Sequence, residues 1–126
     1  MIYIGLDLSS SNDCIVQNGT CMYNTQGIYV DMTESCEICF NTFQNNTRYG
    51  VYLTTLAEDI SIHHNNFIDN NIVVGSSQGY DDGTGNTWYD TSLFEGNYWS
   101  DWVGSGDYSI DGATGSSDLY PLADLV

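Results

Sequence analysis

Two tyrosines and one aspartate could make contact with a sugar. Tyr29, Tyr52 and Asp7 stand at equivalent positions of three short phrases that repeat along the 126-residue chain. Flat tyrosine rings side by side on a strand surface suit stacking on sugar rings. The sequence therefore predicts Tyr29, Tyr52 and Asp7 as glycan contacts. The alternative is an ordinary strand surface, because tyrosine favours strands and cross-strand pairs stabilise them.

Three aspartates near the C-terminal third could hold calcium. Asp81 and Asp82 are adjacent in a Gly-rich stretch, residues 76–87, and Asp101 follows later in the chain. Carboxylate oxygens are hard ligands of the kind that Ca²⁺ takes. A calcium ion at Asp81, Asp82 and Asp101 is one reading, and a solvated acidic turn is the other. Nothing in the sequence requires a cofactor.

The two histidines, His63 and His64, are adjacent in an expected strand. Side chains of adjacent strand residues point to opposite faces, so we expect that the two rings do not chelate one ion. Copper held by one of them with Met22 or Met32 is the disfavoured alternative.

Four cysteines leave three alternatives open. Cys36 and Cys39 have the C-x-x-C spacing, but no second pair stands where a zinc site would need it. Cys14 and Cys36 take the place that Ile60 takes in the next repeat, and Cys21 takes a place that phenylalanine takes later. We expect small core side chains here. A Cys14–Cys36 disulfide and a metal or redox role are the alternatives.

Catalysis has weak support in the residue types. A polyuronate lyase needs cations to neutralise the substrate carboxylate, and Arg48 is the single Lys or Arg. A hydrolase needs two facing carboxylates. Asp7, Asp31 and Asp59 supply carboxylates, but their spacing does not set a geometry. We therefore expect a noncatalytic module; a remnant of a polysaccharide-processing lyase, epimerase or hydrolase and a structural envelope spacer are the alternatives.

A repeat must position these side chains. The phrases Gly-Leu-Asp-Leu, Gly-Ile-Tyr-Val and Gly-Val-Tyr-Leu begin at residues 5, 27 and 50, spaced by 27 − 5 = 22 and 50 − 27 = 23 residues. Alternating apolar positions at this period are typical of a solenoid. The sequence predicts an all-β, right-handed parallel β-helix of about four rungs, each with three strands around a narrow core. The expected inward columns are Leu6, Leu8, Ile28, Val30, Val51, Leu53, Ile72 and Val74; Val16, Ile38 and Ile62; and Cys21, Phe43, Phe67 and Trp99.

Asparagines repeat at two positions of the rung. Asparagine tolerates the left-handed conformation of tight turns, and stacked amides can hydrogen-bond from rung to rung. We expect two structural ladders: Asn41, Asn65 and Asn97, and Asn24, Asn46 and Asn70. Asn18 and Asn45 begin glycosylation sequons at expected turns.

The chain divides into three parts of one domain. Residues 1–75 form the rungs, residues 76–102 an inserted Gly/Asp-rich loop and the last rung, and residues 103–126 a cap. Because the chain opens within a repeat, we expect a fragment of a longer protein, with an export signal upstream and an edge suited to end-to-end self-association.

Charge excludes several partners. The formal net charge is −16, with one Lys or Arg against 17 Asp and Glu. Binding to nucleic acid through phosphate neutralisation is excluded on this basis. No stretch reaches the roughly 18 apolar residues of a membrane span, so we expect no direct membrane insertion.

The repeats resemble a known family. Ile-x-x-Asn-x-Phe phrases followed by Gly-Ile-Tyr-Val phrases over residues 1–75 resemble the NosD-like right-handed parallel β-helix repeats, also described as carbohydrate-binding and sugar-hydrolysis domains. Asn-Thr-Trp at 86–88, Gly-Asn-Tyr-Trp-Ser-Asp-Trp at 96–102 and Asp-Leu-Tyr-Pro-Leu at 118–122 resemble the closing segment in archaeal cell-surface proteins. Residues 104–112 lack most carboxylates of the calcium-type run found there in relatives. The resemblance implies an exported envelope protein, so we expect an extracellular or cell-surface location. Polysaccharide or cell-envelope components are the partners that this location and the tyrosine surface allow.

Overall fold

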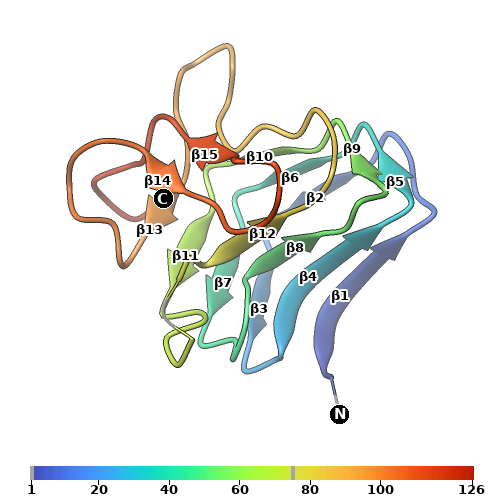
Figure 1. Cartoon of the computed structure of the whole chain (residues 1–126), viewed down its shortest axis with the longest axis horizontal. Coiled ribbons are helices and arrows are strands. Elements are labelled where there is room, and N and C mark those ends of the chain that lie inside the picture. The colour runs from blue at the N-terminus through green and yellow to red at the C-terminus, as the bar shows by residue number, and fades with distance from the viewer. Residues whose placement is uncertain (1, 75) are drawn as a thin grey trace.

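Strands make up the regular structure of the chain. The computed structural model describes residues 2–74 and 76–126, and within these ranges strands but no helices occur. Most strands belong to three parallel sheets that the chain visits in turn (Figure 1). Sheet 1 holds β1 (Ile4–Ser9), β4 (Gln26–Asp31), β8 (Val51–Leu53) and β12 (Gly79–Asp81). Sheet 2 holds β2 (Ile15–Gln17), β6 (Glu37–Cys39) and β10 (Ser61–His63). Sheet 3 holds β3 (Thr20–Met22), β7 (Thr42–Gln44), β11 (Asn66–Ile68) and β13 (Tyr98–Trp99).

Two small sheets complete the fold. The short strands β5 (Thr33–Glu34) and β9 (Ala57–Glu58) pair in parallel between sheets 1 and 2 along the chain. Near the C-terminus, β14 (Tyr108–Ser109) and β15 (Ser117–Asp118) pair antiparallel. The predicted all-β class with parallel sheets is confirmed. The handedness, the count of about four rungs, the capping role of residues 103–126 and the three-part division stay predictions.

A left-handed residue ends most of the strands. Asn18, Phe40 and His64 directly follow β2, β6 and β10, with φ of 61°, 56° and 52°. This conformation is rare for residues with a side chain and turns the chain sharply. The asparagines of the expected ladders are therefore not the left-handed residues themselves: Asn41 and Asn65 each come one position after one.

Alternate strand residues fill a narrow core. Ile28, Val30, Val51 and Leu53 of sheet 1 are all at most 1% exposed. In sheet 3, Phe67 stacks on Trp99 with ring centroids 4.1 Å apart, and Trp99 stacks on Tyr108 at 4.0 Å. The same buried cluster contains Ile38, Ile62 and Phe43. Partly buried side chains pack against it, namely Leu8, Cys14, Val16 and Cys21.

The prediction of Ile72 and Val74 as inward residues is wrong. They lie in a turn and are 70% and 54% exposed. The next strand of sheet 1 is β12, in which Gly79 pairs with Val51 and Asp81 with Leu53. Leu6, in edge strand β1, is 36% exposed.

Residues 76–87, expected as an inserted loop, pair in part with the preceding repeat. Besides β12, Thr84 bridges Glu58 and Thr87 bridges Ser61, so this stretch follows the regular repeat. Residues beyond the repeat lie in the turn at 71–74 and in an excursion closed by the Asp90–Glu95 bridge. Trp88 fills the core above Gly79, where an added Cβ would lie 2.8 Å from its ring.

Replacing Gly50 by alanine will lower the free energy of unfolding by about 1–3 kcal/mol. An added Cβ would lie 2.8 Å from the Phe67 ring and 2.9 Å from Phe43 Cβ, in a core without room to move. Urea unfolding followed by tryptophan fluorescence measures the change. Gly19→Ala is the control, because its Cβ would meet only Asn41 Oδ1 at 3.5 Å; equal losses in both variants would contradict this account.

Candidate functional site

A column of stacked tyrosine rings runs across sheet 1. Tyr29 and Tyr52 have ring centroids 5.5 Å apart and planes 13° apart, and Tyr52 and Tyr80 are 4.4 Å and 4° apart. The register places them side by side on β4, β8 and β12. Each ring therefore covers its neighbour's face, and the column presents ring edges and hydroxyls along its length. Tyr29 ends the column toward β1, where Asp7 is its strand partner.

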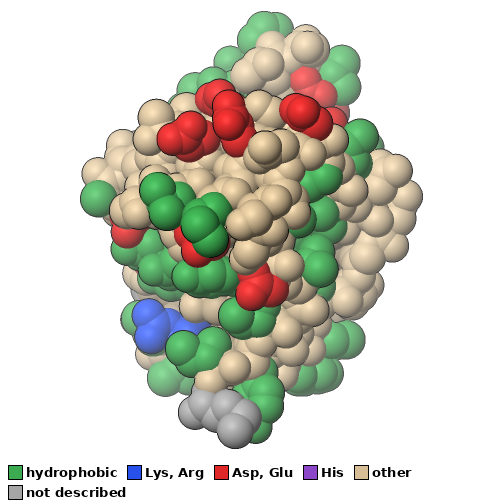
Figure 2. Space-filling model, turned by 90° about the vertical axis from the view of Figure 1, so that its right-hand side faces the viewer, with side chains coloured by type: hydrophobic (Ala, Val, Ile, Leu, Met, Phe, Trp, Pro, Cys, Tyr) green, Lys and Arg blue, Asp and Glu red, His purple; other side chains and the backbone are tan. Residues whose placement is uncertain are grey.

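An open groove of about 630 Å³ adjoins this end of the column. Figure 2 shows the only Lys or Arg side chain of the chain, which is Arg48, beside hydrophobic side chains, with carboxylates gathered farther away on the same face. The groove thus combines aromatic rings, one cation and neutral hydrogen-bonding groups. Its lining residues are Ile2, Ile4, Thr25, Gln26, Tyr29, Arg48 and Tyr52.

The hydroxyls of Tyr29, Tyr49 and Tyr80 stay protonated and can donate, because the pKa of each is raised. The pKa of Tyr80 is raised first by its hydrogen bond to Asp82, whose Oδ2 lies 2.7 Å from the hydroxyl. Burial, together with the nearby acidic groups, raises the pKa of Tyr29. Burial also raises the pKa of Tyr49, which donates to Asp111 Oδ2 at 2.9 Å.

Two members of this surface were not among the sequence-predicted contacts. Tyr80 follows Gly79 without the apolar neighbours that mark Tyr29 and Tyr52, so its strand gave no hydrophobic signal. In the sequence Arg48 stands out only as the single Lys or Arg, and the turn before β8 brings it to the groove. Asp7 is exposed and accepts a hydrogen bond from Ser9 Oγ.

Two asparagine ladders, buried except at the half-buried Asn24, run along the turns. Asn41 donates from its backbone N–H to Asn65 Oδ1 at 3.0 Å, and Asn65 donates likewise to Asn97 Oδ1 at 3.1 Å. The side-chain amides repeat the pattern at 3.1 and 3.0 Å. This ladder ends at Asp118, whose Oδ2 accepts a hydrogen bond from the Asn97 backbone N–H at 2.7 Å.

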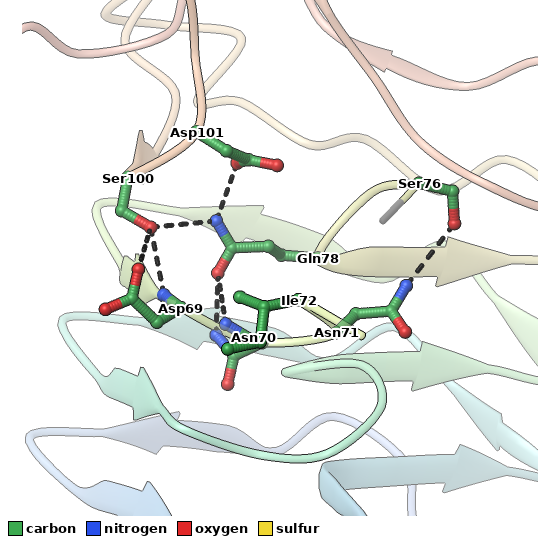
Figure 3. A pocket seen from close by; sticks show the side chains of 8 residues that line it. All are labelled: Asp69, Asn70, Asn71, Ile72, Ser76, Gln78, Ser100 and Asp101. Atoms are coloured by element: carbon green, nitrogen blue, oxygen red, sulfur yellow. Dashed lines mark hydrogen bonds between the residues drawn. The ribbon is translucent and has the colours of Figure 1, made fainter. Parts of the chain in front are cut away.

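The second ladder ends on a glutamine (Figure 3). Asn24 donates to Asn46, Asn46 to Asn70, and Asn70 to Gln78 Oε1 at 2.9 Å. Gln78 Nε2 then donates to Asp101 Oδ1 at 2.7 Å. Asp101 thus serves as the last acceptor of a structural ladder.

The three calcium candidates do not converge. Asp81 is 1% exposed and accepts from the Gly83 backbone, Asn86 Nδ2 and Trp88 Nε1 at 2.9–3.0 Å. Asp82 accepts from Tyr80, and Asp101 from Gln78. Neutral donors already satisfy these carboxylates, and among the described residues they form no cluster with ion-binding spacing. A joint calcium site therefore has no geometric support.

The expectation that His63 and His64 point apart is wrong. His64 has a φ of 52°, so strand alternation fails at this residue and both rings turn to the same side. Their Nδ1 atoms lie 2.7 Å apart. The outer Nε2 atoms bind Glu37 at 2.8 Å and Glu95 at 2.6 Å. Met22, at the end of β3, and Met32, after β4, are exposed at 38% and 53%.

One further carboxylate approaches the two rings. Donor atoms of His63, His64 and Asp90 all lie within 4.8 Å of one another. The backbone N–H groups of Ser92 and Leu93 donate to Asp90 Oδ1, and they lower the pKa of its carboxyl. Asp90 is therefore ionised at neutral pH.

The cysteines lie as free thiols in the structure. The Cys14 backbone N–H donates to Cys36 Sγ at 3.2 Å, and Cys36 is buried in the core. Burial, then the bond to Cys36, raises the pKa of Cys14 to about 11. Burial raises the pKa of Cys39 to about 11 as well, so both remain protonated at neutral pH.

The sequon asparagines occupy turns. Asn18 is exposed and Asn45 half-buried, and both are left-handed. Their glycosylation stays a prediction.

Three parallel sheets that the chain visits in turn, with repeated asparagines at the turns, are typical of the class of β-helix proteins. A family model described as "Periplasmic copper-binding protein (NosD)" matches residues 2–104, and the chain belongs to this family. No curated protein and no solved structure matches the chain significantly.

The family supports an extracellular or envelope location. No helix in the described part of the chain is long and apolar enough to cross a membrane. The family description names copper, which differs from the sequence expectation that no cofactor is required.

Proposed function

We propose that the chain is a noncatalytic extracellular or cell-surface β-helix module that binds polysaccharide in the groove beside Tyr29. The observation that carries this is the groove itself, where the terminal ring of the tyrosine column meets Arg48, Gln26 and Thr25. An apolar ring face with a few hydrogen-bonding groups around it is the usual composition of a sugar site.

The position of the free ring face decides where a sugar stacks. Tyr52 lies between Tyr29 and Tyr80 at 5.5 and 4.4 Å, so both of its faces are covered. Tyr29 has an aromatic neighbour on one side only among the described residues. A sugar ring therefore packs on Tyr29, while Tyr52 stiffens the platform and Asp7 accepts hydroxyl groups at its border.

Charge favours a neutral glycan over a polyuronate. With a net charge of −16 and one cation at the groove, a polyanion meets long-range repulsion that Arg48 alone does not offset. The same shortage weighs against the lyase alternative. A structural spacer, the remaining alternative, needs no groove.

The fold details belong to this proposal as well. We infer a right-handed helix of about four rungs with residues 103–126 covering its last rung. Support comes from Tyr108 stacked on Trp99 and from the bridge of Leu122 to Tyr98. At the other end, β1, β2 and β3 each have a strand neighbour on one side only, which supports end-to-end self-association.

Replacing Tyr29 by alanine will weaken retention on a neutral polysaccharide about tenfold, because the stacking face is lost. A panel of insoluble neutral and uronic polysaccharides, with calcium and with chelator, measures retention and released reducing or unsaturated ends. Tyr23→Ala is the matched control, since this tyrosine is 73% exposed and is not one of the residues that line the groove.

The assay separates the alternatives. Retention that is lost in Tyr29→Ala, with no released ends, supports the binding module. Released ends that depend on calcium would establish the enzyme alternative and restore calcium as a cofactor. No retention on any polysaccharide would leave the spacer.

A further inference from the structure

Two carboxylates set the protons on the histidine pair. Glu37 and Glu95 accept hydrogen bonds from the outer Nε2 atoms of His63 and His64, at 2.8 and 2.6 Å. A carboxylate accepts and does not donate, so each Nε2 carries the hydrogen. In a neutral imidazole this leaves Nδ1 as a bare lone pair.

The two bare Nδ1 atoms then lie only 2.7 Å apart. His63 and His64 are 6% and 9% exposed, so water screens the repulsion between these nitrogens only weakly. A positive charge between them removes it, and this charge is either a shared proton or a metal ion. Carboxylates on the outer nitrogens are the usual support of metal-binding histidines, because they fix the ring and strengthen the inner nitrogen as a donor.

The separation of the nitrogens selects a geometry. With metal–nitrogen bonds of about 2.0 Å, atoms 2.7 Å apart subtend about 85° at the ion. This is the cis angle of a square-planar or tetragonal ion, whereas tetrahedral ligands would lie about 3.3 Å apart. Tetragonal nitrogen and oxygen ligands are typical of Cu²⁺ and Ni²⁺.

A third ligand and a covered side complete the site. The backbone N–H groups of Ser92 and Leu93 hold the Asp90 carboxylate in place, and one of its oxygens lies within 4.8 Å of the histidine donor atoms. On another side, the Phe40 ring stacks on His64 with centroids 5.1 Å apart. Asp90 is half-buried, so an ion can enter past it.

We propose that His63 and His64, with Asp90, bind one tetragonal divalent ion of the Cu²⁺ or Ni²⁺ type through their Nδ1 atoms, with Glu37 and Glu95 as positioning residues. The site goes beyond polysaccharide binding and stands without it. It lies on sheet 2 and the 90–95 excursion, while the groove lies on sheet 1.

Titration calorimetry with Cu²⁺ and Ni²⁺, and electron paramagnetic resonance of the Cu²⁺ form, test the proposal. We expect one ion per chain, an axial spectrum and splitting from two imidazole nitrogens. The double variant His63→Asn, His64→Asn should lose at least a hundredfold in affinity together with the nitrogen splitting. Glu95→Gln changes an exposed carboxylate and should lower the affinity about tenfold. This single variant keeps the proposal testable even if the double variant does not fold.

Cys39→Ser is the matched control. Its Sγ belongs to a second cluster with Glu37 and His63, and the thiol stays protonated at neutral pH. We expect its affinity for Ni²⁺ to match that of the unmodified chain. The proposal would be overturned by loss of binding in Cys39→Ser, by a spectrum without nitrogen splitting, or by no binding at all. The last outcome would show that a shared proton joins the two rings.

Discussion

Replacing Asn65 by alanine will lower the free energy of unfolding by about 3–5 kcal/mol. The side-chain amide lies at 0% exposure in the middle of a ladder. Its Nδ2 donates to the carbonyls of Ile38 and His63 at 2.9 and 3.0 Å, and its Oδ1 accepts from the Asn41 backbone at 3.0 Å. Alanine leaves these three buried groups without that partner, and each costs about 1–3 kcal/mol, partly relieved by relaxation.

Asn24→Ala is the matched control at the edge of the other ladder. Its side chain donates one hydrogen bond, to the Met22 carbonyl at 3.1 Å, at a site that water reaches. We expect a loss below about 1 kcal/mol. Urea unfolding of both variants at neutral pH gives the two free energies. Similar values for both would show that the amide ladder adds little beyond the hydrophobic core.

The sequence predicts the fold where apolar residues alternate without interruption. Ile28, Val30, Val51 and Leu53 carry that alternation, and all four are buried. It fails at β12, because Trp88 fills the core from a different part of the rung and leaves room only for glycine at position 79. A pattern of apolar residues cannot find a strand whose inward positions are Gly and Asp.

The histidine pair escaped prediction for a local reason. The rule that neighbouring side chains diverge holds inside a strand, but His64 is the left-handed residue that follows β10. A signal was present in the repeat, since Asn18 occupies the equivalent position and asparagine favours this conformation. Glu95 had no such signal, because the 90–95 excursion brings it to His64 from outside the repeat.

The acidic residues also show what spacing cannot give. Asp81 and Asp101 look like ion ligands in the sequence, yet amide and indole N–H groups surround them in the fold. Each of these carboxylates accepts hydrogen bonds from polar donors that other segments of the chain supply. Spacing in the sequence does not show which donors the fold brings to which carboxylate. Asp118, which drew attention only as part of the closing segment, is instead the end of a ladder.

Replacing Asp118 by alanine will lower the free energy of unfolding by about 3–5 kcal/mol. The carboxyl is at 0% exposure and accepts from the Asn97 backbone at 2.7 Å, Trp99 Nε1 at 2.8 Å and the Tyr120 backbone at 2.9 Å. Alanine leaves these donors unsatisfied where the C-terminal segment meets the last strands. Asp118→Asn keeps one oxygen for Asn97 and Trp99, so about 1 kcal/mol is expected for it.

The loss in Asp118→Ala should also depend on pH. Burial raises the pKa of Asp118 above its ordinary value of 3.8, outweighing the N–H donors that lower it. The folded chain therefore keeps this proton at pH values where the unfolded chain has released it, and stability falls as pH rises through that interval. The alanine variant lacks this contribution, so the gap between the two proteins should be widest below pH 3.8 and narrow as pH rises toward the raised pKa. Urea unfolding from about pH 3, just below the ordinary carboxyl pKa, to about pH 7 measures the gap. The control is Asp107→Ala, at an exposed carboxylate. A gap that widens with pH would show instead that the surrounding donors favour the carboxylate.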